Sequence, residues 1–347
     1  MSTRSKQRFV QRMSDGQAVL LVRLDGVGDA ALCVPALQGL SAAYPRARFG
    51  AVCSGANAQL FSDRVERVYV CDSPGMVSEC AAQLRHDSYT HALVATEEVS
   101  GYKLARASGA RFRAGFWHGL QKPFKSGWQY AQLTDRIFRP AAWSPNPEHE
   151  VTTMYRLAHA LGAKLPAPAD PSELRSWLRI ERASGDAPPS GSVAFQITPK
   201  LLTHGWGPAA LAEWIVTAAR VSGLERCALV AAAQDEGLAC AIMEQVPTAA
   251  RTEGRITLVS SQPLPRWLGF LADCRLIITP DTGAAHVAGM LGVPVIDLFE
   301  SDGFERLSQQ WRPWAAPARC LPKPRWAESA AESFGAALAG AVGELTA

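Results

Sequence analysis

The sequence VLLVRLDGVGD occupies residues 19–29 and predicts the first strand and turn of an α/β domain. Its aliphatic run is typical of a strand that is buried on both faces. Asp25 and the two glycines then end the strand, and an apolar helical pattern follows. Pro35 fits an early turn of that helix, and Tyr44-Pro45 ends it.

The rest of the chain repeats this alternation of strand and helix. Further strands are predicted at residues 48–53, 65–71, 91–95, 192–197, 227–232, 255–259, 276–279 and 293–299. Helices are predicted at residues 150–161, 209–221, 236–245, 284–291 and 327–345. Such alternation favours parallel sheets with helices on both faces. A length of 347 residues suits two domains, which we place at 1–170 and 171–347 because residues 166–171 are rich in proline.

The composition is that of a globular protein, with 48% hydrophobic and 19% charged residues. Residues 1–165 hold 20 Lys and Arg against 13 Asp and Glu, a net +7, and the remainder holds 15 against 19, a net −4. A basic first half indicates either an anionic partner or a solvated basic surface. No basic run is interleaved with aromatic residues, which argues against nucleic acid.

The eight cysteines are scattered and form no C-x-x-C pair, so we expect buried free thiols and no metal site. The apolar run at residues 18–22 is too short for a signal peptide or a membrane span. We therefore expect a cytoplasmic protein.

The glycine turn also matches a dinucleotide fingerprint, Gly26-x-Gly28-x-x-Ala31. No Asp or Glu occurs between Asp29 and Asp63, however, so the carboxylate that would bind a ribose is missing. A carboxylate at this position is suited to accept a proton from a substrate hydroxyl. Asp29 is thus either a general base or a cap of the following helix, which Asp also favours.

A second strand-to-helix junction reads TPDTGAAH at residues 279–286. The backbone amides of Thr282, Gly283 and Ala284 are predicted at a helix start, where the helix dipole favours a diphosphate. Asp281 is placed to bind sugar hydroxyls, and His286 on the first turn faces either a ligand or the sheet. Ligands of doubly wound sheets bind at the carboxyl ends of strands, where both junctions lie.

Together the two junctions resemble glycosyltransferase family 9, which includes the ADP-heptose:lipopolysaccharide heptosyltransferases. The likeness is carried by residues 19–44, with Arg23, Gly28 and Asp29, and by residues 272–294, with Asp281-Thr282-Gly283-x-x-His286. The resemblance implies a GT-B fold, in which two Rossmann-like domains face a central cleft. The first domain would bind the acceptor and the second the nucleotide-sugar, with the final helix packing back on the first domain.

The same resemblance implies an inverting transfer that needs neither a metal nor a bound cofactor. Asp29 matches the catalytic base, and Asp281, Thr282, Gly283, Ala284 and His286 match the donor-binding region. Arg23 and Gly28 are acceptor-side candidates. The basic first half suits an anionic glycan or glycolipid acceptor such as the lipopolysaccharide core, reached in the cytoplasm or at the inner membrane surface.

The sequence departs from the family where a lysine usually precedes an aromatic residue and neutralises the donor phosphates. In the stretch TPKLLTHGW, residues 198–206, His204 stands where that lysine would be. Either His204 replaces it, as a mostly neutral group at pH 7, or Lys200 reaches in from the loop. Thr198 begins the same loop. In a second departure, Asp235 or Glu236 is either a ribose ligand or an acidic helix start.

We therefore predict a glycosyltransferase, with ADP-heptose as the donor. Three alternatives stay open from the sequence. They are a transferase of other donor specificity, a catalytically weakened nucleotide-sugar-binding protein, and an NAD(P)-dependent oxidoreductase.

Overall fold

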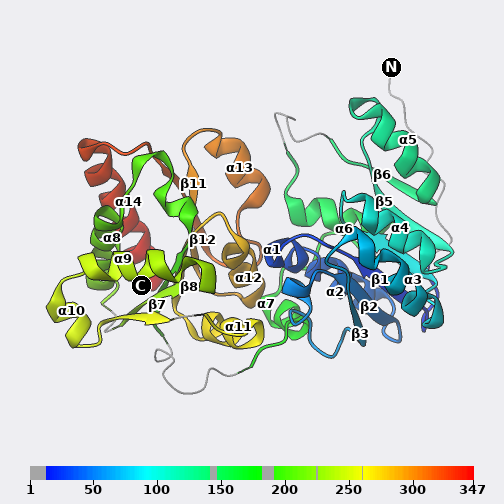
Figure 1. Cartoon of the computed structure of the whole chain (residues 1–347), viewed down its shortest axis with the longest axis horizontal. Helices are drawn as coiled ribbons and strands as arrows, with labels where there is room; N and C mark the ends of the chain where they lie inside the picture. Colours follow the sequence, from blue (N-terminus) through cyan, green and yellow to red (C-terminus); the bar gives the residue numbers. More distant parts are fainter. Residues whose placement is uncertain (1–12, 141–146, 182–190, 224–225, 260) are drawn as a thin grey trace. The chain divides into compact units, whose positions relative to one another are not determined.

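The computed structural model describes residues 13–140, 147–181, 191–223, 226–259 and 261–347. The chain divides into two compact units, Met1–Pro168 and Ala169–Ala347, and each contains one six-stranded sheet with flanking helices (Figure 1). All strand pairs in both sheets are parallel. None of the helices in the described ranges is long and apolar enough to cross a bilayer.

The first sheet has the strand order β3-β2-β1-β4-β5-β6. Its strands are β1 Ala18–Val22, β2 Arg48–Cys53, β3 Arg67–Val70, β4 His91–Val94, β5 Phe112–Trp117 and β6 Asp135–Phe138. The helices of this unit are α1 Val27–Ala31, α2 Val34–Ala43, α3 Val77–His86, α4 Val99–Ala107, α5 Pro123–Gln132 and α6 Glu150–Ala160. Short 3₁₀ turns are η1 Gly55–Asn57, η2 Pro74–Met76 and η3 Gly119–Gln121.

The second sheet has the order β12-β11-β10-β7-β8-β9. Its strands are β7 Val193–Ile197, β8 Cys227–Ala231, β9 Ile256–Val259, β10 Leu276–Pro280, β11 Val295–Glu300 and β12 Ala318–Lys323. The helices are α7 Pro171–Leu174, α8 Pro208–Val221, α9 Glu236–Gln245, α10 Thr248–Thr252, α11 Leu264–Asp273, α12 Gly283–Leu291, α13 Phe304–Trp311 and α14 Glu328–Thr346. Turns of 3₁₀ type are η4 Arg175–Trp177, η5 Pro199–Gly205 and η6 Ala233–Asp235.

Both sheets share the same doubly wound topology. In each sheet the first strand of the unit lies beside the fourth, so the strand order reverses between β1 and β4 and between β7 and β10. Ligands of such sheets bind outside the carboxyl ends of the strands at this reversal. The two predicted junctions directly follow β1 and β10, so the topology places each of them at a reversal point.

The central strands are buried along their whole length, as their aliphatic sequences predict. All five residues of β1, and all five of β10, are buried between helices. The final helix, α14, lies in the second unit, where Phe334, Leu338 and Val342 join a core that includes Trp214 of α8. Its contact with the first domain, which the family resemblance implies, stays a prediction.

The helix that follows the first junction differs from the sequence prediction. Instead of one helix, the chain forms the short helix α1 and then restarts at α2, with Leu32 and Cys33 between them. Pro35 takes the second position of α2, where its missing amide costs no hydrogen bond. Glycines and prolines in the sequence also predict a loop at residues 184–191, which lies outside the described residues except for Gly191.

Candidate functional site

Arg23 follows β1 and joins the two carboxylates of the glycine turn. Its guanidinium is almost fully buried, with Nε 3.0 Å from Asp25 Oδ2 and Nη2 2.6 Å from Asp29 Oδ1. Both aspartate side chains are about one-third exposed, so each is anchored and still reaches solvent. Gly26 is the N-cap of α1, and no side chain of the described residues caps it. The Asp29 carboxylate therefore binds Arg23 rather than acting as the cap, while Gly28 is buried in the same helix.

A second charged group lies at the carboxyl ends of β4, β5 and β6. Glu97 Oε2 is 3.1 Å from His118 Nε2, 3.2 Å from Lys122 Nζ and 2.9 Å from Lys125 Nζ, and Glu97 Oε1 is 3.5 Å from Arg139 Nε. These cations hold the pKa of the Glu97 carboxyl well below its usual range, with the contact to His118 as the largest cause. One carboxylate is thus shared among four basic side chains.

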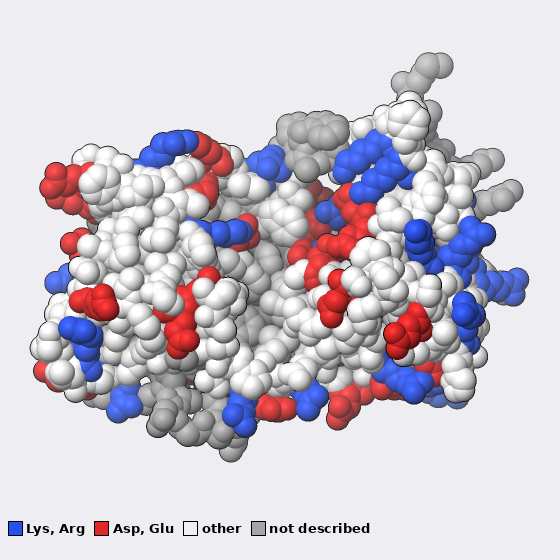
Figure 2. Space-filling model, viewed as in Figure 1, with Lys and Arg blue, Asp and Glu red and all other residues white. Residues whose placement is uncertain are grey.

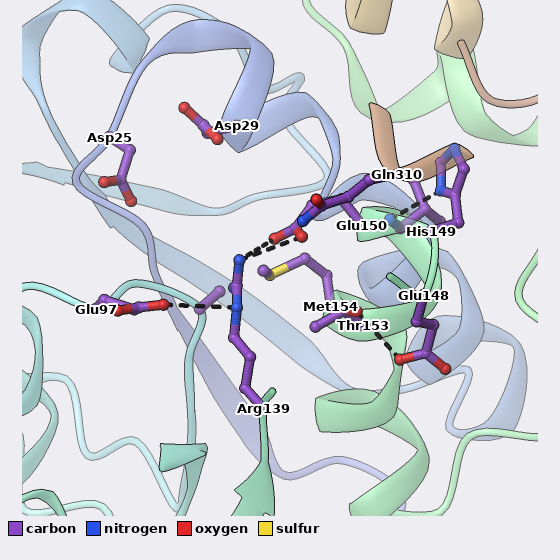
Figure 3. Close-up of polar contacts among 12 residues, drawn as sticks. Asp25, Asp29, Glu97, Arg139, Glu148, His149, Glu150, Thr153, Met154 and Gln310 are labelled. Atoms are coloured by element: carbon purple, nitrogen blue, oxygen red, sulfur yellow. Dashed lines mark hydrogen bonds and ion pairs between the residues drawn. The ribbon is translucent and has the colours of Figure 1, made fainter. Parts of the chain in front are cut away.

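Arg139 and His118, the two basic side chains of this group that are largely buried, make further polar contacts. Arg139 Nη2 lies 3.0 Å from Glu150 Oε1, and Figure 3 shows the Arg139 side chain between Glu97 and Glu150. His118 is 1% exposed, and its Nδ1 is 3.0 Å from the carbonyl oxygen of Arg139. Both ring nitrogens of His118 thus face oxygen atoms, one of Glu97 and one of the Arg139 backbone. The first unit thus presents a surplus of positive charge beside the Arg23 turn.

Sequence reasoning missed this group, which we call the Glu97 cluster (Glu97, His118, Lys122, Lys125, Arg139 and Glu150). Glu97, His118 and Arg139 each follow a strand within three residues. That signal is usable only when the strands are recognised, and β5 and β6 are absent from the sequence prediction.

In the second unit, the TPDTGAAH segment forms the predicted helix start. Thr282 is the N-cap of α12, and its hydroxyl accepts from the amide of Ala284 at 3.3 Å. The Thr282 hydroxyl also lies 2.8 Å from that of the buried Thr279. Gly283 is the first residue of α12. The hydroxyls of Thr279 and Thr282 thus fix the backbone at the positive end of the helix dipole.

Asp281 and His286 lie together at this helix start. The Asp281 side chain is about one-quarter exposed, and its Oδ1 is 3.9 Å from Nε2 of His286. The imidazole itself is 6% exposed and stands against the ring of Trp311, with ring centroids 5.9 Å apart. His286 is therefore largely enclosed by protein at this helix start.

Lys200 and His204, the two candidates for the phosphate-binding cation, lie on η5 after β7 and face different partners. Lys200 is exposed, donates from Nζ to the carbonyl oxygen of Asp281, and lies 3.8 Å from Asp281 Oδ2. His204 adopts a left-handed backbone conformation with φ of 63°. Its Nδ1 lies 2.8 Å from Oε2 of Glu300 at the end of β11. The geometry thus favours Lys200 as the cation beside the α12 start.

Lys323, at the end of β12, donates hydrogen bonds to the η5 segment. Its ammonium is 1% exposed and donates to the carbonyl oxygens of Lys200 and Thr203, each at 3.1 Å, and to the Thr203 hydroxyl at 2.7 Å. It also lies 3.0 Å from Glu300 Oε1. Burial lowers the pKa of Lys323, and the Glu300 carboxylate opposes that shift. Neither Glu300 nor Lys323 is recognisable from sequence, because each contacts η5 from more than ninety residues away.

Two buried polar groups near this helix start have no hydrogen-bond partner among the described residues. They are the hydroxyl of Thr198, directly after β7, and both carboxyl oxygens of Asp297 on β11. Burial, with Asp281 nearby, raises the pKa of Asp297 well above its usual value. Asp235 and Glu236 lie at the start of α9, after β8, where acidic residues favour a helix start.

Comparison with known proteins identifies the family. The model of glycosyltransferase family 9 (heptosyltransferase) matches residues 77–333. The structure of ADP-heptose lipopolysaccharide heptosyltransferase II from E. coli is 16% identical, with a TM-score of 0.72, and the match covers 95% of this chain and 98% of that one. E. coli heptosyltransferase WaaC with ADP-2-deoxy-2-fluoro heptose is 18% identical, with a TM-score of 0.68 and coverage of 92% and 98%.

A glycosyltransferase family 9 structure from Veillonella parvula is 17% identical, with a TM-score of 0.68 and coverage of 90% of this chain and 87% of that one. Comparison with curated protein sequences gave no match. At these identities the structural likeness shows the fold, and it confirms the GT-B prediction. The family model covers most of the chain and excludes the oxidoreductase interpretation. The chain therefore belongs to glycosyltransferase family 9 (heptosyltransferase) and is a glycosyltransferase.

Proposed function

We propose that this enzyme transfers a sugar from a nucleoside diphosphate sugar to a hydroxyl of an anionic acceptor, with inversion and without a metal. The observation that carries the proposal is the placement of the Lys200 ammonium at Asp281, next to the start of α12. A helix N-terminus and an adjacent cation suit a diphosphate, whose charge grows as it leaves. Thr282 and Gly283 would hold the diphosphate, with Asp281 and Thr198 toward the sugar or ribose.

Asp29 is the proposed base. The acceptor oxygen attacks the anomeric carbon as the bond from that carbon to the diphosphate breaks, and the hydroxyl proton passes to the Asp29 carboxylate. The nucleoside diphosphate leaves with the bonding electron pair. Arg23 holds one oxygen of Asp29 at 2.6 Å, which fixes the carboxylate, and the one-third exposure of the side chain keeps it accessible to an acceptor.

ADP-heptose is our proposed donor, and the lipopolysaccharide core is our proposed acceptor class. The donor is supported by the two structurally similar E. coli enzymes, one of which is described with an ADP-heptose analogue. The acceptor is supported by the Glu97 cluster, where Lys122, Lys125 and Arg139 offer charge to a phosphate or carboxylate. Both assignments place the reaction in the cytoplasm.

A catalytically weakened nucleotide-sugar-binding protein is the second candidate. It is favoured by the contact of His204 with Glu300, which turns the residue at the usual lysine position away from Asp281. This candidate predicts donor binding without transfer, and the proposed function predicts both.

A thermal-shift panel of ADP-, UDP- and GDP-sugars tests the donor. A ligand that binds only the folded protein raises its stability by an amount that grows with occupancy. We expect ADP and ADP-heptose to raise the melting temperature more than UDP or GDP compounds at equal concentration. A shift produced by UDP or GDP compounds alone would contradict the heptose assignment and leave the fold unaffected.

A further inference from the structure

An exposed aromatic and apolar surface lies at the β6 edge of the first sheet, next in sequence to Lys122 and Lys125 of the Glu97 cluster. In the described part of the chain nine large hydrophobic side chains are exposed, and four of them fall within residues 120–138. Leu120 and Phe124 are each 94% exposed, well above the other seven, while Tyr130 and Phe138 are 52% and 42% exposed. We call these four residues the edge patch.

Two of the four side chains, Tyr130 and Phe138, are joined through the ring of Trp117. The ring of Trp117 meets the rings of Tyr130 and Phe138 edge-on, each with centroids 6.3 Å apart. The Phe138 ring also lies within 3.5 Å of where a Cβ of Gly119 would stand, next to Leu120. A single exposed leucine needs no explanation, but two almost fully exposed large side chains beside exposed aromatics mark an interaction surface.

The charges around the edge patch favour an anionic partner. Residues 117–139 hold four Lys and Arg and one Asp. Lys122 and Lys125 stand at the start of α5, which has no acidic residue in its first turn, although the helix dipole disfavours cations there. Arg136 lies over the ring of Tyr130, 3.4 Å from its centroid. Figure 2 shows Lys and Arg side chains at several places on this face of the first unit, with acidic side chains near some of them.

We propose that the edge patch docks the enzyme on a membrane surface that contains anionic lipid. Leu120 and Phe124 enter the headgroup region, Tyr130 and Phe138 lie at the interface, and the basic side chains face anionic headgroups. Aromatic and basic side chains around exposed apolar ones are the combination that binds such interfaces. The proposal extends the proposed function, because a lipid-linked acceptor lies at such a surface, but its evidence is this surface alone.

Vesicle co-sedimentation of the full chain tests the proposal. The probes are vesicles of phosphatidylcholine alone and of phosphatidylcholine mixed with phosphatidylglycerol. We expect stronger binding to the mixed vesicles, weakened by added salt. The Leu120→Ser/Phe124→Ser double variant should bind at least about tenfold more weakly, since each side chain loses its burial in the interface. The matched control is Val99→Ser/Leu165→Ser, which removes two exposed hydrophobic residues of the same unit and should bind as the wild type does.

The affinity for ADP, measured on the same proteins, separates this proposal from the proposed function. It should be equal in all three, and equal far-UV circular dichroism and urea midpoints check that the substituted unit is folded. Membrane docking would be overturned if the wild-type protein bound neither vesicle type, or if the double variant bound as well as the wild type. Neither result would bear on the proposed transfer reaction. A double variant that instead loses self-association in sedimentation velocity would show that the edge patch is an interface between two copies, which also overturns the proposal.

Discussion

Lys200 and His204 are four residues apart on η5, yet one faces the start of α12 and the other faces Glu300. His204 stands at the position where the family resemblance implies a lysine, and its imidazole contacts the carboxylate of Glu300. We propose that Lys200, from an earlier turn of the same segment, supplies the cation that the sequence lacks at that position. The sequence leaves both residues as candidates because nothing in their spacing tells which way each side chain turns.

This arrangement predicts unequal effects on donor binding. Lys200→Met should weaken ADP binding about tenfold or more in a calorimetric titration, because hydrogen bonds from a charged group contribute about 1.5–3 kcal/mol. Lys200→Arg should restore part of it. His204→Ala, the contrasting variant on the same segment, should change ADP affinity less than about threefold. A larger loss from His204→Ala than from Lys200→Met would reverse our assignment of the two residues.

Asp297 predicts a pH-dependent stability of its own. Because its pKa is raised in the folded protein, its contribution is fully present below the unfolded value of about 4 and is lost as pH rises toward the folded value. Asp297→Asn removes this titration. We expect the variant to unfold at higher urea concentration than wild type at pH 8 and at a similar concentration at pH 4. If the variant and the wild type have equal urea midpoints at pH 8 as well as at pH 4, the Asp297 carboxyl is not held neutral in the folded protein.

Residue identity was thus predictable where a motif stands at a strand end and not where contacts come from distant strands. Asp29 and Asp281 are visible as part of glycine-containing turns. Glu97, Glu300 and Lys323 belong to no recognisable motif. Each is singled out only by an ion pair that the fold creates with a residue distant in sequence.

Among the elements, most strands were predictable, including the edge strands β3 and β9, whereas β5, β6 and β12 were missed. The uniformly buried and mainly apolar β1, β7 and β10 stand out in the sequence, and all were predicted. The edge strands β6, with the sequence DRIF, and β12, with ARCLPK, are only partly buried and therefore carry charged residues. They do not form an apolar run, so the sequence did not reveal them. The division of the first helix into α1 and α2 was also missed, although Pro35 marks it.

The η5 segment depends on one buried cation, which gives a prediction for the element as a whole. Lys323→Met leaves the Thr203 hydroxyl and the carboxylate of Glu300 without this partner, so the urea midpoint should fall by an amount equivalent to about 3–5 kcal/mol. ADP binding should also weaken, since Lys200 is held by the same contacts. Lys164→Met, which removes an exposed lysine, should change stability by less than about 0.5 kcal/mol. An unchanged midpoint for Lys323→Met would mean that η5 is held by other contacts.

At the scale of the whole molecule, the chain uses one strand order twice and assigns different chemistry to each copy. The first unit carries Asp29 and a surplus of basic side chains, and the second carries the helix start with Lys200. Strand and helix alternation was enough to predict two doubly wound sheets. The charge of each half, +7 and −4, and the two motifs were visible in the sequence, whereas the Glu97 cluster required the fold.

The most direct test of the account is the rate of sugar transfer by Asp29→Asn from ADP-heptose to a lipopolysaccharide-core acceptor, measured together with ADP affinity. Asp25→Asn is the matched control, because Asp25 pairs with the same arginine and is equally exposed. We predict that Asp29→Asn lowers kcat by about 10²–10⁴-fold with ADP affinity unchanged, and that Asp25→Asn has a far smaller effect. Transfer at the wild-type rate by Asp29→Asn, or no transfer by the wild-type enzyme despite normal ADP binding, would contradict the account.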